Sequence, residues 1–179
     1  TGGGSNKLHR SGTTTYYSGG YEGVVSGASS DHIVTITGDP SGVDMSSYTI
    51  YGGGMGDPNV VPTKSADRNR IIVQNGATAT TIIGGEGIGA TGNTVSIINA
   101  TIKRAVLGGN GTWAGQQNYS GDAVGNTVNI EGNSHIIGDG AGVANFEAMV
   151  SGGRARYGAS ANNNTAVSYT HLTLPTKRI

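Results

Sequence analysis

Three aspartates that precede repeated apolar segments are the residues of this sequence best placed to do chemistry. Asp31 and Asp67 each stand just before such a segment, and Asp122 stands in a similar place before Asn126. If the repeats stack, acids far apart in sequence align on one face, and a carboxylate pair there hydrolyses glycosidic bonds. The competing interpretation is turn chemistry, because most of the eleven acids stand beside Gly and such residues usually serve turns.

Other signatures of catalysis or metal binding are weak. His32 and His135 lie at or near strand starts without spaced Cys or carboxylate partners, so we expect solvent-facing side chains rather than metal ligands. The run Gly52–Asp57 resembles a calcium-binding nonapeptide, but the equivalent runs after Gly84 and Gly108 have no Asp at that place. We therefore assign no catalytic residue, no metal and no cofactor, and expect a protein that is not an enzyme.

The spacing of glycines in residues 87–92, G-x-G-x-x-G, matches a dinucleotide-binding turn. That motif must open a helix whose N-terminus faces the pyrophosphate. Here it precedes Asn93–Ile97, which alternates polar and apolar residues like a strand. The context therefore argues against nucleotide binding.

One loop carries a set of side chains suited to a sugar. Residues 110–125 hold the only Trp of the chain, Trp113, with Gln116, Asn118 and Tyr119 nearby. An aromatic ring stacks on a sugar while amides and hydroxyls bond its oxygens, so these four residues are the candidate binding residues. The competing interpretation is that Trp113 packs on the flank of the fold and holds the loop in place.

Repeats organise the chain. The run Gly92-Asn93-Thr94-Val95-Ser96-Ile97 returns as Gly125-Asn126-Thr127-Val128-Asn129-Ile130. Each copy leads to a second apolar segment that runs into glycine: Val106-Leu107-Gly108-Gly109 after the first copy and Ile136-Ile137-Gly138-Asp139 after the second. Weaker copies start near His32, Asn69 and Asn163. The first-strand anchors are Val34, Ile71, Val95, Val128 and Ala166, at spacings of 37, 24, 33 and 38 residues. The shortest spacing gives the bare repeat, and the remainder is loop.

A unit of about 24 residues with two short strands and no helix cannot bury its apolar face alone. The sequence therefore predicts an all-β fold, a parallel right-handed β-solenoid (β-helix), with Val and Ile inward and Asn, Thr and Ser outward or in turns. Glycine, 33 of 179 residues, would serve the sharp turns. A sandwich or propeller would use more aromatic core residues and fewer glycines.

Composition excludes some partners. The formal net charge is zero and only 12% of residues are charged, which removes the electrostatic footprint of a nucleic-acid-binding protein. The chain has no Cys, and no apolar run approaches the length of a transmembrane helix. A neutral surface rich in Gly, Ser, Thr and Asn therefore points to other classes of partner.

The run Tyr119–Gly132, with Tyr17-Ser18-Gly19-Gly20-Tyr21 and the Ile-x-Gly-Gly returns, resembles the passenger repeats of Gram-negative autotransporters. The resemblance is loose over residues 16–167 and closer over 119–132. It implies a right-handed β-helix displayed at the cell surface, followed by a C-terminal β-barrel translocator that this segment does not contain. Such passengers act as adhesins or colonisation factors.

Three segments follow. Residues 1–15 are expected to be a polar loop from a preceding repeat or a disordered cut end. Residues 16–167 are expected to be the repeat domain of a longer array, and 168–179 a non-native tail. The tail breaks the repeat pattern and resembles adapter read-through in a metagenomic gene fragment. Tyr17–Gly20 is expected to end a unit whose first strand is degenerate.

We therefore favour a stalk or adhesin that presents loops 55–68, 110–125 and 139–162 to a host-surface protein or glycan. The last of these is expected to hold a helical turn or an extra strand. A polysaccharide lyase or hydrolase and a non-binding spacer are the alternatives. A fragment cut from an array exposes strand edges, so end-to-end self-association is also expected. Membrane contact would come only through the absent β-barrel.

Overall fold

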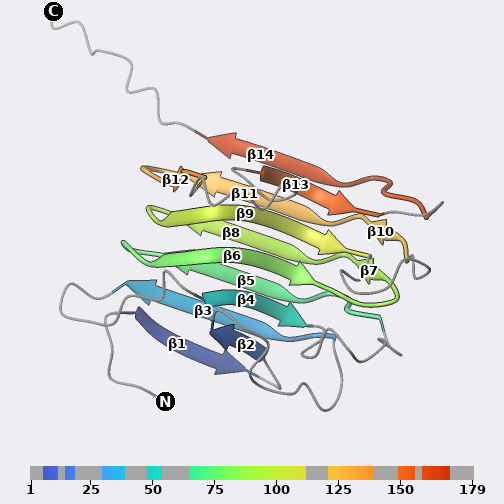
Figure 1. The fold of residues 1–179 in the computed structure, drawn as a ribbon, viewed down its shortest axis with the longest axis horizontal. Coiled ribbons are helices and arrows are strands. Elements are labelled where there is room, and N and C mark those ends of the chain that lie inside the picture. Colours follow the sequence, from blue (N-terminus) through green and yellow to red (C-terminus); the bar gives the residue numbers. More distant parts are fainter. Residues whose placement is uncertain are drawn as a thin grey trace, which may run out of the picture.

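The computed structural model describes residues 6–11, 15–18, 30–38, 48–53, 65–111, 121–138, 149–155 and 159–169. Every regular element in this part of the chain is a strand (Figure 1). Within these ranges, no helix is long and apolar enough to cross a membrane.

The strands form three sheets. The first sheet has the order β1-β3-β5-β8-β11-β14, the second β12-β9-β6-β4-β2 with β13 also paired to β9, and the third joins β7 and β10. The strands of the first sheet are β1 (Asn6–Ser11), β3 (Ile33–Gly38), β5 (Arg70–Gln74), β8 (Thr94–Ile98), β11 (Thr127–Glu131) and β14 (Thr165–Tyr169). Those of the second are β2 (Thr15–Ser18), β4 (Tyr48–Gly53), β6 (Thr78–Gly85), β9 (Thr101–Asn110), β12 (His135–Ile136) and β13 (Met149–Arg154). The third holds β7 (Ala90–Thr91) and β10 (Ala123–Val124).

From β3 onward all pairing is parallel and joins equivalent residues of successive repeats. The predicted anchors are confirmed as direct neighbours: Val34 pairs with Ile71, Ile71 with Val95, Val95 with Val128 and Val128 with Ala166. We define the repeats by these alignments as residues 32–68 (first), 69–92 (second), 93–125 (third) and 126–163 (fourth). In Figure 1 they lie one above another in chain order. This arrangement is compatible with a parallel β-helix.

The core lies between the first and second sheets. In β3 and β5 alternate residues are buried, and the buried cluster between the sheets consists of short apolar side chains, including Ile36, Ile71, Ile82, Val95 and Val106. Because equivalent strands of successive repeats stack on one another, the interior of the stack has a small cross-section, which Val, Ile and Ala fill.

The repeat contains a third strand that the sequence did not reveal. β7 and β10 are only two residues long, and they pair in register, Ala90 with Ala123 and Thr91 with Val124. β10 falls within residues 110–125, which were expected to be loop, and β7 falls within the G-x-G-x-x-G run of residues 87–92. So short a strand leaves no alternating pattern to detect.

The second strand of the fourth repeat was assigned wrongly. Ile136-Ile137-Gly138 was expected to match Val106-Leu107-Gly108, but Ile136 pairs with Ile102. The true counterpart of Gly109 is Gly153 on β13. Residues 137–148 separate β12 from β13, which both pair with β9. The expectation of an extra strand within 139–162 is confirmed by β13.

The N-terminal segment also differs from expectation. Residues 1–15 were expected to be loop, but Asn6–Ser11 forms β1, which pairs antiparallel with β3. Tyr17 was expected to end a parallel unit, but β2 pairs antiparallel with β4. An alternating pattern does not encode the direction of the chain, so the sequence could not distinguish the two pairings.

Candidate functional site

A ladder of four asparagines starts the repeats. Asn69, Asn93, Asn126 and Asn164 stack in this order. The Oδ1 atoms of Asn93, Asn126 and Asn164 each accept from the side-chain Nδ2 and the backbone N–H of the preceding asparagine, at 2.9 Å. The Nδ2 groups of Asn93 and Asn126 also donate to the carbonyls of Ala66 and Ala90. These asparagines were expected to face outward or lie in turns. Asn69, Asn93 and Asn126 are instead buried.

The glycine pairs make room for this ladder. A Cβ on Gly85 would meet the side chain of Asn93, and one on Gly109 would meet Asn126. The Gly-Gly returns that mark the repeats in the sequence thus face the amides that start the next repeat. Their cause is the close approach of neighbouring backbone and of the ladder side chains rather than a turn.

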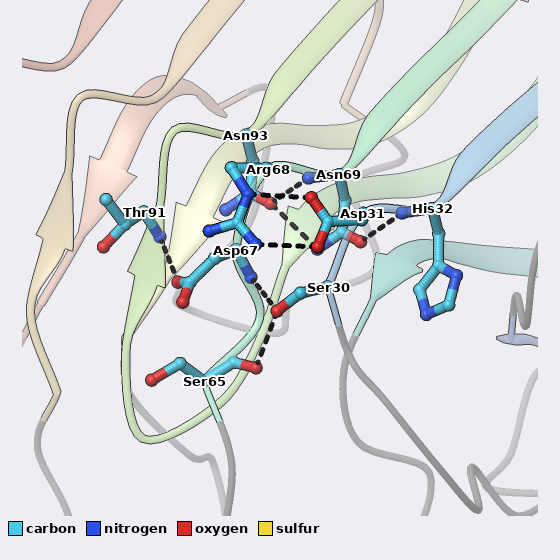
Figure 2. Close-up of polar contacts among 9 residues, drawn as sticks. All are labelled: Ser30, Asp31, His32, Ser65, Asp67, Arg68, Asn69, Thr91 and Asn93. Atoms are coloured by element: carbon cyan, nitrogen blue, oxygen red, sulfur yellow. Dashed lines mark hydrogen bonds and ion pairs between the residues drawn. The ribbon is translucent and has the colours of Figure 1, made fainter.

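A residue with positive φ, in the left-handed region, precedes each ladder position, and two of these residues belong to the cluster shown in Figure 2. Asp31 (φ 64°) and Arg68 (φ 54°) occupy positions that Gly92 and Gly125 fill in the following repeats. Arg68 donates two hydrogen bonds of 2.7 Å to the Asp31 carboxylate, and both side chains are exposed. The hydrogen bond from Arg68 lowers the pKa of Asp31, which therefore stays ionised at neutral pH.

The predicted acidic row does not form. Asp31 lies in the left-handed position directly before the ladder position of its repeat. Asp67 lies one residue earlier relative to Asn69, and Asp122 lies two residues earlier still relative to Asn126. The Asp67 carboxylate accepts from the backbone N–H of Thr91, and that of Asp122 accepts from Ser160. Each carboxylate thus serves a backbone donor or an ion pair. Within the described ranges, no three His, Asp or Glu residues gather as a metal site would require.

The histidines divide. His135 is exposed, as expected, but His32 is buried at 5% exposure, so the expectation of a solvent-facing side chain is wrong for His32. It stands at the ladder position of the first repeat, and its backbone N–H donates to Asn69 Oδ1.

Insertions in the first and third repeats enter the stack at one shared corner, whereas the insertion between β12 and β13 of the fourth repeat interrupts the second sheet. Gly53 of the first repeat pairs with Gly85 of the second, and Ala66 occupies the hydrogen-bonding position that Ala90 occupies one repeat later. Between these two points the first repeat has eight more residues than the second. The third repeat spans 33 residues between ladder positions against 24 in the second. The nine additional residues are 112–120, which begin and end at Gly111 and Gly121. A backbone hydrogen bond from Gly121 to Gly111 closes their base.

We call this region the loop corner and define it as Gly53, 86–89, Gly111 and Gly121. Its centre is the second repeat, which has no insertion. Ile88 there is 45% exposed although it is apolar. Insertions therefore enter the stack on both sides of a short turn with an exposed apolar residue.

A buried acid lies in the loop corner. Glu86 is 6% exposed, and its Oε1 accepts a hydrogen bond of 2.7 Å from Asn110 Nδ2. Burial raises its pKa to about 7, and hydrogen bonds from Asn110 and Tyr51 oppose that rise. No local pattern indicated the burial of Glu86, because an acid beside Gly suggests an exposed turn.

The four candidate binding residues, Trp113, Gln116, Asn118 and Tyr119, lie outside the described residues, as do residues 54–64 and Asp57 of the calcium-like run. The G-x-G-x-x-G run lies in strand and turn, in line with the prediction that it opens a strand. It includes β7 and ends at the left-handed Gly92 before β8.

Comparison with protein-family models, with curated proteins and with solved structures finds no match to this chain.

Proposed function

We propose that this chain is part of a right-handed parallel β-helix that acts as a surface-exposed stalk or adhesin of the autotransporter passenger type. It would bind a host-surface protein or glycan through the loop corner. The observation that carries the proposal is that two long insertions, within 54–64 and at 112–120, enter the stack at the same corner of the first and third repeats.

The spacing of the insertions favours a shared binding surface. Parallel strands lie about 4.8 Å apart, so the bases of the two insertions are separated by roughly 10 Å across the second repeat. Loops on a rigid scaffold are common carriers of binding residues. One ligand can therefore contact both insertions and the exposed Ile88 between them.

The pairing pattern supports the β-helix interpretation. Equivalent residues of four successive repeats pair in register, and a buried asparagine ladder runs along the same direction. Asparagine ladders are typical of in-register stacks because each amide both donates and accepts along the stack.

The polysaccharide hydrolase alternative has less support. Its candidate acids, Asp31, Asp67 and Asp122, stand at different positions of their repeats and already accept structural hydrogen bonds. A glycosidase needs two carboxyl groups that flank one bond. Here Asp31 is ion-paired with Arg68, while Asp67 and Asp122 each accept a backbone N–H.

Deletion of residues 112–120 tests the proposal. It joins Gly111 to Gly121, whose backbones are already hydrogen-bonded, and gives the third repeat the length of the second. We expect the variant to fold with unchanged circular dichroism and to lose binding to cultured epithelial cells and to a glycan array. Trp113→Ala should lose most of the same signal.

A matched control variant leaves the loop corner unchanged. Asn129→Ala alters an outward, half-buried residue of the first sheet and should bind as the parent does. Binding by the folded deletion variant at the parent's level would contradict the proposal.

A further inference from the structure

Glu86 connects the two repeats that carry the insertions. Its carboxyl group takes hydrogen bonds from Tyr51 of the first repeat and Asn110 of the third. Its backbone N–H donates to Gly53, the last described residue before 54–64. On the other side, the N–H of Gly87 donates to Asn110, two residues before 112–120. One buried side chain thus lies between the two insertions.

We propose that Glu86 makes the loop corner pH-responsive: its neutral carboxyl group holds the first, second and third repeats together here, and its ionisation loosens the corner. The claim that this pH response regulates ligand binding rests on the proposed function. The pH response of the fold itself does not depend on that function.

The surroundings of Glu86 favour the neutral form. The described groups that face it are the phenol of Tyr51 on β4, the amide of Asn110 on β9 and backbone of the neighbouring repeats. Arg154 of β13 pairs with Asn110, so it lies one strand further along the same row. The two hydrogen bonds favour the carboxylate but do not offset the loss of water.

The direction of the pH effect follows from the raised pKa. The pKa is about 7 in the closed corner and ordinarily 4.5, so the closed corner binds the proton more tightly than the opened one. The stabilisation is complete below pH 4.5 and is lost as pH rises to about 7. The opening equilibrium of the corner should therefore increase on the order of 100-fold between pH 4.5 and 8.

Hydrogen exchange of the full chain, measured by mass spectrometry from pH 5 to 8 and corrected for intrinsic exchange rates, tests this. We expect protection of peptides covering Ile83–Gly92 and Val106–Gly111 to fall by at least tenfold, while protection of Asn93–Ile97 changes little. In Glu86→Gln, which keeps the acceptor for Asn110, protection should stay high and independent of pH.

Glu131→Gln is the control, because Glu131 is a half-buried acid of the first sheet far along its repeat from the corner. It should show the parental pH profile. A wild-type corner whose protection does not change with pH would overturn the inference, as would a Glu86→Gln variant that keeps the parental profile.

The two proposals fail separately. Hydrogen exchange uses no ligand, so its result stands whether or not the deletion of 112–120 abolishes binding. Where the parent binds cells, binding should weaken from pH 6 to pH 8, and binding by Glu86→Gln should not.

Discussion

At the scale of single residues, the asparagine ladder is the main polar contribution to the interior. Asn93 has 0% exposure and takes part in six hydrogen bonds. Its side chain accepts two from Asn69 and donates two, its backbone N–H donates to Asn126, and its carbonyl accepts from Thr127. Each partner is itself buried or part of the stack. Removal of this amide leaves donors and an acceptor with no water to replace it.

We predict that Asn93→Ala lowers the free energy of unfolding by about 3 kcal/mol or more, because each buried group left unpaired costs about 1–3 kcal/mol. Chemical denaturation followed by circular dichroism measures the change. Asn129→Ala, at an outward position of the same sheet, should cost less than about 1 kcal/mol. Equal losses in the two variants would show that the ladder carries no special weight.

The burial of these polar residues could not be predicted from the sequence. Asn beside Gly and Thr normally signals a turn, and Glu beside Gly does too. Asn93 and Glu86 are buried only because another repeat places a partner above or below each of them. That partner lies 24 or 33 residues away, so no local pattern reports it.

At the scale of elements, the returning glycines set how closely repeats approach. A Cβ on Gly84 would overlap the carbonyl oxygen of Gly108, and one on Gly108 would overlap that of Gly152. Both atoms belong to backbone in paired strands, so neither can move without disturbing the stack. Gly76, at φ +79° in a turn, has open space around its Cβ position.

These two environments predict different losses of stability when each glycine is replaced by alanine. Gly84→Ala should lower the free energy of unfolding by about 3 kcal/mol, since it overpacks backbone against backbone. Gly76→Ala should cost about 1 kcal/mol through its left-handed conformation alone. Thermal or urea unfolding of the two variants measures this order, and a larger loss for Gly76→Ala would refute the explanation.

Element prediction succeeded where alternation was long and failed where an insertion intervened. Strands with Val or Ile at every second position, such as β5 and β8, gave the right register at once. In the fourth repeat, residues 137–148 interrupt the second row, so the apolar pair Ile136-Ile137 was matched to the wrong part of β9. The glycine pair at 152–153 was the better marker, because it faces Asn164.

At the scale of the whole molecule, the two ends of the stack differ. β1 and β2 run antiparallel along β3 and β4 at one end. At the other end, β14 continues to Tyr169, two residues into the segment predicted to be a non-native tail, and within the described residues no strand covers its outer edge. End-to-end association stays a prediction, and it is expected first at the β14 end because free strand edges recruit further strands.

The central claim is that successive repeats pair in parallel and in register. The chain has no Cys, so two engineered cysteines form a unique pair for spin labels. Thr94 pairs with Thr127, whereas an antiparallel pairing of β8 with β11 would bring Thr94 opposite Glu131. We predict strong dipolar broadening of the electron spin resonance spectrum for Thr94→Cys/Thr127→Cys, whose backbones lie roughly 5 Å apart, and weaker broadening for Thr94→Cys/Glu131→Cys. The reverse result would contradict the parallel stack and every proposal that rests on it.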